Sequence, residues 1–372
     1  MERLVPWLTL QSVPGIGNLR FRRLIRSFGT PERTLQAPAN LLAQVEGISH
    51  VLAKAIERQR TPDWVWNEIE RCSKAGYSLI TQNDPAYPAL LLAIPDPPPV
   101  LYCNGKVERD WCHIAVVGSR RSTAYGRSSA SRLSRDLSVR GICIVSGMAR
   151  GIDSAAHKGA LDAGGKTVAV LGSGLKRIYP PENRTLFHSI AENGAVISEF
   201  PLDAEPEPHH FPQRNRIISG VALGTVVVEA TRRSGSLITA RLAAEQGREV
   251  FAIPGNIHAP STTGTHGLIR QGAKLVETAE DVVEEVLPHV ALPESPAATR
   301  RNPGDRREPG QGLRNDQQKV FDAIAHDPVH IDDLVRRCGM GAGALTAVLG
   351  ELELMGVVIQ EPGKFFMRGS AG

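Results

Sequence analysis

Short apolar segments rich in β-branched residues alternate with helix-length segments through the middle of the chain. The predicted strands are 113–117, 142–145, 167–171, 195–200, 225–230 and 249–253. The helix-length segments include 124–140, 154–163, 183–193 and 236–246. Nearly continuous apolar strands that are separated by helices are typical of a parallel sheet covered on both faces. Residues 76–287 are therefore predicted to form an α/β domain with a Rossmann-like, doubly wound, mostly parallel sheet.

Two similar segments precede this domain, VPGIGNLRFRRLIRSFG at 13–29 and VEGISHVLAKAIERQ at 45–59. Each is a glycine-bearing turn followed by a helical stretch, which predicts an all-α helix-hairpin-helix (SAM-like) domain over residues 1–75. Backbone N–H groups at such a turn and helix start can meet a phosphate. The same pattern also builds protein-contact modules, so both roles stay open.

A segment rich in Pro, Gly and Arg follows the sheet at 288–313 and has no hydrophobic period. It cannot bury enough surface to fold, and we expect a flexible linker. Three helical stretches (316–325, 330–337 and 343–355) and a hairpin then predict a small winged-helix domain over 314–372. In DNA-reading winged helices the third helix carries basic residues. Here it carries Glu351 and Glu353, which favours a protein-contact or structural role.

Composition changes this picture little. The chain has 372 residues, enough for two or three domains, and its formal net charge of +4 is too small to argue for nucleic acid. Five scattered cysteines without a C-x-x-C pair predict reduced thiols, with neither disulfides nor a zinc site. No apolar signal core and no run of roughly 20 apolar residues occur, so we expect a cytoplasmic protein without membrane contact.

Small residues and cations follow four of the predicted strands. The segments are Gly118-Ser119-Arg120-Arg121, Ser146-Gly147-Met148-Ala149-Arg150-Gly151, Gly172-Ser173-Gly174-Leu175-Lys176-Arg177 and Thr231-Arg232-Arg233-Ser234-Gly235-Ser236. Ligands of open parallel sheets bind outside the carboxyl ends of the strands. Small residues admit an anion to the backbone N–H groups, helix starts add partial positive charge, and Arg donates a bidentate fork. One such loop would reflect tight turns alone, but four on one edge predict a phosphate-binding surface.

Catalytic and cofactor signatures are absent from the sequence. It has no G-x-G-x-x-G with a following acid, no P-loop, no G-x-S-x-G and no H-E-x-x-H. We therefore expect no cofactor and no metal site. Asp153 is predicted to cap the helix that follows it. Glu199 and Glu229, at strand ends, are more naturally partners of Arg214 or Arg216 than bases, so the chain is predicted not to be an enzyme.

A strand of nucleic acid fits this edge better than a small molecule does. Several phosphates in a row need several donor loops, and unpaired bases need flat surfaces on which to stack. Tyr179 and Phe211 lie in loops beside basic residues and are the base-stacking candidates. Either ring is equally suited to filling the core.

Together these motifs resemble the DNA-processing protein A (Smf) family. The segments that carry the resemblance run in family order from about residue 113 to 276. They are VVGSRRSTAYG, SGMARGIDSAAHKGAL, TVAVLGSGLKRIYPPEN, ISEFP, FPQRNRIISG, VVVEATRRSGSLITARLAAEQGREVFAIPG and GTHGLIRQGAKLV. The family also commonly has a helix-hairpin-helix-like front domain and a winged-helix tail.

The resemblance implies a recombination mediator of natural transformation. Such proteins bind and protect incoming single-stranded DNA, act as homodimers through the Rossmann-like domain, and help load a RecA-type recombinase past single-strand-binding protein. It also implies a phosphate clamp at Arg120 and further donors or cations on the neighbouring loops. The run 214–216 is expected either to line the same pocket or to brace it through Glu229. The complete predicted phosphate-binding set is Gly118, Ser119, Arg120, Ser146, Gly147, Ala149, Gly151, Gly172, Gly174, Lys176, Arg177, Arg214, Asn215, Arg216, Ser234 and Gly235.

The chain departs from the family at Pro181, where many relatives have a lysine directly after Tyr-Pro. A DNA-contacting cation is then missing, with Arg177 or Arg184 expected to compensate. Two alternative functions stay open. One is a nucleotide-processing enzyme like the phosphoribohydrolases, whose P-G-G-x-G-T-x-x-E stretch is absent here. The other is a winged-helix protein that binds double-stranded DNA.

Overall fold

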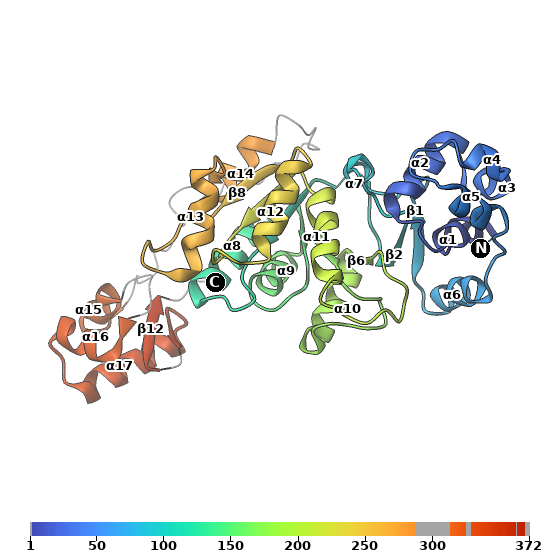
Figure 1. Cartoon of the computed structure of the whole chain (residues 1–372). Coiled ribbons are helices and arrows are strands. Elements are labelled where there is room, and N and C mark those ends of the chain that lie inside the picture. Colours follow the sequence, from blue (N-terminus) through green and yellow to red (C-terminus); the bar gives the residue numbers. More distant parts are fainter. Residues whose placement is uncertain (1, 110, 287–312, 325–328, 362, 369–372) are drawn as a thin grey trace. The chain divides into compact units, whose positions relative to one another are not determined.

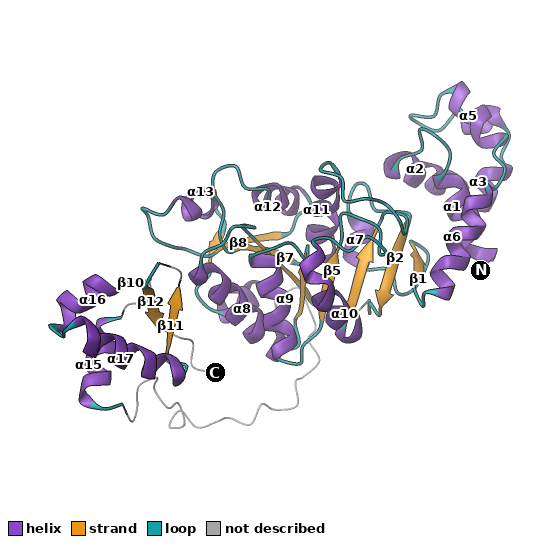
Figure 2. Ribbon diagram, turned by 90° about the horizontal axis from the view of Figure 1, so that it is seen from below, coloured by secondary structure: helices purple, strands orange, loops and turns teal. Residues whose placement is uncertain are grey.

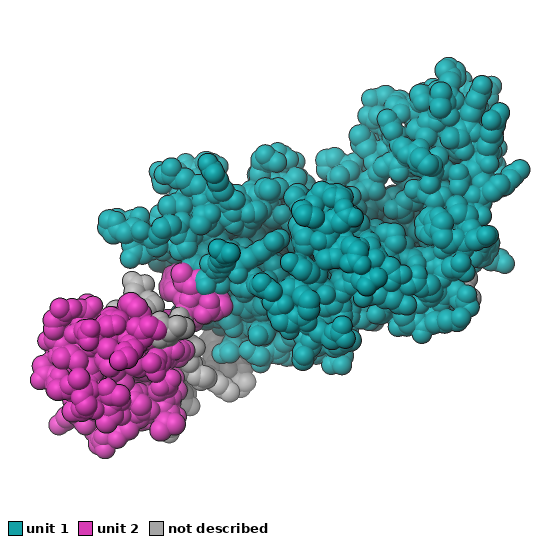
Figure 3. All heavy atoms as spheres, turned by 60° about the horizontal axis from the view of Figure 1, so that its bottom comes forward, with its two compact units in different colours: residues 1–122, 129–292 teal, residues 123–128, 293–372 magenta. Residues whose placement is uncertain are grey.

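The computed structural model of the chain describes residues 2–109, 111–286, 313–324, 329–361 and 363–368. The chain divides into two compact units, one of residues 1–122 and 129–292, the other of residues 123–128 and 293–372 (Figure 3). The first unit holds the N-terminal helices and the large sheet, and the second holds the C-terminal domain. Among the described residues, none of the helices combines the length and apolar character needed to cross a bilayer.

The N-terminal domain is all-α, as predicted (Figure 1). Its elements are η1 (Glu2–Leu4), α1 (Val5–Gln11), α2 (Asn18–Phe28), α3 (Pro31–Gln36), α4 (Ala39–Leu42), α5 (His50–Glu57) and α6 (Asp63–Lys74). Helices α2 and α5 begin directly after the two glycine-bearing turns, and the Ser49 side chain caps α5 by accepting from the Leu52 N–H. Trp7 stacks on Phe21 with ring centroids 5.6 Å apart. This stacked pair lies in the buried core of the domain.

The first unit contains a nine-stranded sheet with the strand order β1-β2-β6-β5-β4-β3-β7-β8-β9. The strands are β1 (Ser78–Thr81), β2 (Val100–Gly105), β3 (His113–Val117), β4 (Cys143–Ser146), β5 (Thr167–Val170), β6 (Ala195–Ser198), β7 (Gly224–Val227), β8 (Glu249–Ala252) and β9 (Lys274–Leu275). From β6 to β9 all pairings are parallel, while β1 and β2 are antiparallel. The six predicted strands form the centre, which confirms the fold class, and the three strands not predicted lie at the two edges.

The sheet is covered by helices on both faces (Figure 2). They are α7 (Ala89–Ala93), α8 (Ala124–Val139), α9 (Ile152–Asp162), α10 (Arg184–Asn193), α11 (His210–Val221), α12 (Ser236–Glu245), α13 (Thr263–Arg270) and α14 (Ala279–Val286), with short η2 (Pro181–Asn183) and η3 (Pro260–Thr262). Strand side chains alternate between the faces. Ala115 and Val117 belong to the core with α11 and α12 residues, whereas Ile114 and Val116 belong to the core with α8, α9 and α14 residues.

The order of the strands reverses beside β3. The chain runs outward from β3 through β4 and β5 to β6, and α11 then leads to β7, which pairs with β3 on its other side. In doubly wound sheets such a reversal opens a crevice between the loops that follow the two strands. The loops after β3 and β7 carry two of the four predicted phosphate-binding segments.

The second unit is a winged-helix domain with its own core. It consists of α15 (Asn315–Ala323), β10 (Val329–His330), α16 (Ile331–Cys338), α17 (Ala342–Leu354), β11 (Val358–Glu361) and β12 (Phe365–Arg368). The predicted helices and hairpin are confirmed, and β10 adds a third strand in the order β10-β12-β11. Buried Phe321, Leu334 and Leu349 belong to the core of this domain. The predicted linker lies outside the described residues except for Leu313.

Candidate functional site

A groove of about 740 Å³ lies at the crevice between the loops after β3 and β7. It is lined by Val117, Gly118, Ser119, Arg120, Arg121, Ala149, Asp153, Tyr179, Pro206, Pro208, Phe211, Pro212, Arg214, Asn215, Ile218, Thr231, Ser234, Gly235, Ser236, Ile238 and Thr239. The structure thus brings together predicted site residues from four separate loops and from α11. Below, this lined cavity is called the switch-point groove.

The loop after β3 places two exposed cations at the groove. Gly118 is required by packing, because a Cβ there would lie 2.6 Å from Cγ1 of Ile152. The Ser119 hydroxyl accepts the Arg121 N–H at 3.1 Å and stabilises the turn. The Arg120 guanidinium lies 5.0 Å from the ring centroid of Phe211, within the range of a cation–π contact. Among the described residues, no carboxylate forms an ion pair with Arg120 or Arg121.

Hydrogen-bond donors of the loop after β4 already have acceptors within the protein. The N–H groups of Gly147 and Ala149 both donate to Oδ2 of Asp153, at 3.1 and 3.3 Å. The hydroxyl of Ser146 is buried and donates to the carbonyl of Val116 at 2.6 Å. These three predicted phosphate donors therefore have protein partners. Gly151 has a φ of 78° and lies where a Cβ would be 2.4 Å from the Ser119 carbonyl oxygen, so its role is close packing of the two loops.

Asp153 does not cap α9, and the prediction that it does is wrong. The N-cap position is Gly151, and the Asp153 carboxylate accepts from the preceding loop instead. Burial raises the pKa of Asp153, while the charge of Arg214 and the two N–H donors act in the opposite direction. The carboxylate is thus committed to holding the loop rather than to proton transfer.

Arg214 is a buried cation in the lining of the groove. Its side chain is buried, and its Nη1 donates to the carbonyls of Gly147, at 2.7 Å, and Val170. Burial lowers the pKa of Arg214 to about 10, with Asp153 opposing the shift and Arg120 adding to it. The guanidinium therefore stays protonated at neutral pH. Arg214 contributes positive potential to the groove and fixes the loop after β4.

The loop after β5 contributes Tyr179 to the lining of the groove. Gly172 is needed because a Cβ would lie 2.9 Å from the Phe211 ring, and Gly174 because one would lie 2.0 Å from the Pro201 carbonyl oxygen. Lys176 and Arg177 are exposed but are not among the groove-lining residues. Arg177 instead pairs with Glu205 at 3.2 Å. Arg184, expected to compensate for Pro181, is likewise absent from the groove lining.

Tyr179 and Phe211 form an aromatic wall of the groove. Their ring centroids are 5.7 Å apart and their planes are inclined by 52°. Tyr179 is 42% exposed and Phe211 is partly exposed, so neither ring is buried in the core. Phe211 also lies 5.9 Å from the Arg214 guanidinium carbon, so this ring is near both cations. The wall combines flat apolar faces with positive charge.

Asn215 and Arg216 have different surroundings. Asn215 lines the groove, whereas Arg216 is buried and pairs with Glu199 at 2.6 Å and with Asp96 at 2.8 Å. The Arg216–Glu199 pair was among the pairings that the sequence indicated. Glu199 also accepts from the Asn18 side chain at 3.2 Å, so this ion pair joins the sheet to α2. Burial raises the pKa of Glu199, and its ion pair with Arg216 opposes the shift.

The start of α12 leaves backbone donors open to the groove. Ser234 and Ser236 share a hydrogen bond of 2.8 Å between their hydroxyls. Gly235 is exposed, and a Cβ built there meets no heavy atom within 4 Å. Within the described part of the chain, the N–H groups of Gly235 and Ser236 have no acceptor. Free N–H groups at a helix start are a favourable environment for an anion.

A second groove adjoins the first and was missed by the sequence reasoning. It has a volume of about 850 Å³, shares Ser234 and Ile238 with the switch-point groove, and lies between α12 and α13. Its lining includes Arg232, Arg233, Arg241 and Arg270. The sequence does hold a clue to Arg232 and Arg233 as groove residues. They come directly after β7, in the same T-R-R-S-G-S segment as Ser234 and Gly235.

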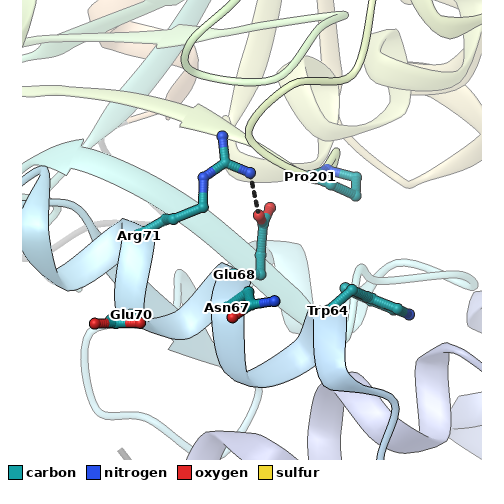
Figure 4. A pocket seen from close by; sticks show the side chains of 6 residues that line it. All are labelled: Trp64, Asn67, Glu68, Glu70, Arg71 and Pro201. Atoms are coloured by element: carbon teal, nitrogen blue, oxygen red, sulfur yellow. Dashed lines mark hydrogen bonds and ion pairs between the residues drawn. The ribbon is translucent and has the colours of Figure 1, made fainter.

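A third hollow, of about 540 Å³, lies against α6 and is lined by Trp64, Asn67, Glu68, Glu70, Arg71 and Pro201 (Figure 4). Its polar groups serve the packing of α6 on the loop after β6. Glu68 accepts from the Leu202 N–H at 2.7 Å and from Arg71 at 3.5 Å, and Arg71 also pairs with Asp203. None of the predicted site residues lines this hollow.

The switch-point groove is suited to binding an anion rather than to acid–base chemistry. Of the described residues that line it, Asp153 is the sole carboxylate, and one of its oxygens accepts two backbone N–H groups. Glu229 is 1% exposed and is not a lining residue. The remaining polar groups are cations, hydroxyls, an amide and backbone donors. This combination binds phosphates and lacks a paired acid and base.

Comparisons with known proteins give concordant similarities. Residues 78–287 match the family described as DNA recombination-mediator protein A, and residues 304–364 match the DprA winged helix domain. Protein Smf of Synechocystis is 34% identical over 97% of this chain and 98% of its own length. Protein Smf of Escherichia coli is 40% identical over 78% of this chain and 77% of its own length.

Two solved structures are also similar. DNA processing protein A of Streptococcus pneumoniae has a TM-score of 0.67 and 35% identity, covering 75% of this chain and 97% of its own. The Helicobacter pylori protein of the same name has a TM-score of 0.52 and 29% identity, covering 57% and 97%. The latter structure is described as showing a single-stranded DNA binding mode.

Proposed function

This chain belongs to the DNA recombination-mediator protein A family, and from that premise we propose that it binds single-stranded DNA in the switch-point groove. The observation that carries the proposal is the stack of Arg120 over Phe211 beside the open start of α12. Cations and free N–H groups there face a cavity whose sole carboxylate among the described lining residues already has hydrogen-bond partners. The groove thus offers an anion several donors, and its three arginines, Arg120, Arg121 and Arg214, outnumber that one carboxylate.

The phosphates of the strand bind along two sides of the groove. On one side Arg120 and Arg121 are exposed and free of ion pairs within the described residues, so neither must break an ion pair to bind. On the other side the N–H groups of Gly235 and Ser236 donate to a phosphate at the start of α12. Arg214 adds its positive charge to the groove lining, and its Nη1 is held by hydrogen bonds to the backbone carbonyls of Gly147 and Val170.

The bases stack on the wall formed by Tyr179 and Phe211. Stacking on an aromatic ring is worth about 1–3 kcal/mol per base and tolerates any base, because each has a π face. The partial exposure of both rings leaves faces accessible to a ligand. A base pair in a duplex has no free face of this kind, and this difference favours single strands over duplex DNA.

Membership of the family supports a more specific biological role. We propose that the protein acts on incoming DNA in natural transformation, protects it, and helps a RecA-type recombinase replace single-strand-binding protein. A homodimer and a cytoplasmic location belong to the same proposal, as do the predicted boundaries of the domains.

The two alternative functions are less well supported. An enzyme of the phosphoribohydrolase kind needs a carboxylate that can act on a substrate, and Glu229 is buried away from the groove lining. A winged-helix protein that reads duplex DNA needs basic residues on the third helix. In α17, Glu351 instead pairs with Arg314 at 2.5 Å and accepts from Gln317 at 2.7 Å, which are contacts within the domain.

The test of the groove is the variant Arg120→Ala, measured by fluorescence anisotropy with labelled oligo-dT. A hydrogen bond to a charged group is worth about 1.5–3 kcal/mol, so affinity should fall roughly 10–100-fold. Because the variant binds one phosphate fewer, the slope of log K against log salt should also become shallower by about 0.7.

The matched control is Arg177→Ala. Arg177 is similarly exposed but pairs with Glu205 and does not line the groove. Removing the Arg177 side chain should change the affinity for oligo-dT by less than about threefold, since an exposed ion pair outside the groove contributes little. Wild-type affinity of Arg120→Ala for oligo-dT at low salt would overturn the proposal.

A further inference from the structure

Two histidines and a glutamate converge on the loop between β6 and α11. Glu207, His209 and His210 each offer one ligand atom, and these three atoms all lie within 4.8 Å of one another. The sequence contains no zinc-site spacing such as H-E-x-x-H, so this grouping was not expected from the residues alone. It arises because the chain turns into α11 at this point.

The backbone of this segment is held in place before any ligand binds. Pro206 and Pro208 flank Glu207, and proline fixes φ at about −65°. The Glu207 N–H donates to Glu205 O at 2.9 Å, and the His210 N–H donates to Glu207 O at 3.0 Å. A ligand set on such a segment loses little conformational freedom when it binds, and this pre-organisation favours affinity.

The side chains are also oriented. The His210 ring stacks on Phe200 with centroids 4.0 Å apart, and its Nδ1 lies 3.1 Å from Glu205 O. An imidazole that donates Nδ1–H to a carbonyl carries the lone pair on Nε2. A hydrogen bond of this kind is what fixes the tautomer of metal-bound histidines. His209 lies against Glu207, with Nδ1 3.3 Å from the carboxylate oxygen.

We propose that Glu207, His209 and His210 bind a transition-metal dication of the Zn²⁺ class. Two imidazoles and one carboxylate are a donor set that Zn²⁺ takes in sites with an open fourth position. The side chains of His209 and Glu207 are 68% and 56% exposed, so an ion reaches them from solvent and keeps room for a further ligand. Pro206 and Pro208, on either side of Glu207 in the sequence, line the switch-point groove, so the proposed site adjoins residues of that groove.

The test is a zinc titration of the untagged full-length chain by isothermal calorimetry, with Co²⁺ as a spectroscopic probe. All five cysteines are buried, so thiols do not compete for the metal. One equivalent of Zn²⁺ should bind, and Co²⁺ should show the strong visible absorption of a low-coordinate site. His209→Ala should weaken binding by at least roughly tenfold, since even a residue that only hydrogen-bonds to a ligand is worth 10–100-fold.

Further variants separate the ligands from the fold. His258→Ala, an exposed histidine on another loop, should bind zinc like the wild type. His209→Cys should restore binding, because a thiolate replaces the imidazole as ligand. The exposed position of His209 leaves folding intact in these variants, which circular dichroism checks. The proposal is overturned if the wild type binds zinc no more tightly than a Glu207→Gln/His209→Ala double variant.

Discussion

At the scale of single residues, environment decides which of the similar side chains serve the groove. Arg120 is exposed and contacts Phe211, Arg214 is buried and bonded to the Gly147 carbonyl, and Arg216 is paired with Glu199. All three were predicted to meet phosphate. A buried guanidinium that is bonded to carbonyls supplies potential but few donors, whereas an exposed one without a carboxylate partner can reorient toward a ligand.

His157 is a second residue whose environment has a measurable consequence. It is fully buried on α9, and its Nδ1 lies 2.7 Å from the Thr167 hydroxyl, which itself donates to Ile144 O. Nδ1 therefore carries the proton. Within the described part of the chain, Nε2 has no hydrogen-bond partner. Burial, together with the charge of Arg214, lowers the pKa of His157 from 6.5 to about 3.

This shift predicts a loss of stability in mild acid. Between pH 3 and 6.5 the unfolded chain binds a proton at this residue that the folded chain does not, so the free energy of unfolding falls as pH drops. From pH 7 to 5 the contribution is at most about 2 kcal/mol. Urea unfolding should show this fall in the wild type and a smaller one in His157→Gln. His188→Gln, which changes an exposed histidine, is the control. If the free energy of unfolding of His157→Gln falls with pH as steeply as that of this control, the lowered pKa of His157 is contradicted.

At the scale of elements, the start of α12 is the clearest case of a helix end left open. Its N-cap, Gly235, makes no side-chain cap, has an ordinary φ of −61°, and has free space around it. No backbone or packing requirement therefore demands glycine at this position. The absence of a side chain instead lets a phosphate approach the N–H groups closely.

Gly235→Asp should separate binding from stability. The new side chain fits without strain, and a carboxylate at a helix start is neutral to favourable, so stability should change by less than about 0.5 kcal/mol. The same negative charge repels phosphate, and affinity for oligo-dT should fall at least about tenfold, or 1.4 kcal/mol. The neutral control Gly235→Ser should retain most of the affinity. Equal binding by the Asp and Ser variants would exclude a phosphate at this helix start.

At the scale of the whole molecule, the switch-point groove belongs to one compact unit. All of its lining residues lie in the unit that contains the sheet, and the winged-helix domain has its own core, with buried residues such as Val320 and Leu349. Separate cores allow the two units to unfold separately. A ligand that binds one folded unit stabilises that unit alone.

Calorimetry of the full chain should therefore show a DNA-dependent shift confined to one transition. At a free oligo-dT concentration 100 times the dissociation constant, the unit with the sheet should gain about 2.7 kcal/mol, and the winged-helix transition should not move. Deleting residues 314–372 should leave the affinity for oligo-dT largely intact. A shift of the winged-helix transition, or loss of single-strand binding on deletion, would favour the duplex-binding alternative instead.

The sequence by itself determined the class of fold and the edge of the sheet at which the candidate site lies. Strand and helix periods, glycine turns and the small residues after each strand are local properties of contiguous residues, and local backbone chemistry is enough to recognise them. Three edge strands were not predicted from the sequence. Strand β9 has only two residues, and β1 and β2 lie outside the alternation of strands and helices.

The tertiary structure alone decided which predicted donors are free. The N–H groups of Gly147 and Ala149 satisfy Asp153, Arg177 pairs with Glu205, and Arg216 pairs with Glu199. The arginine pairs join segments that are apart in the sequence, so no local pattern reveals them. A polar group is free to bind a ligand only if no protein group already satisfies it. The positions of all its potential partners are set by the tertiary structure.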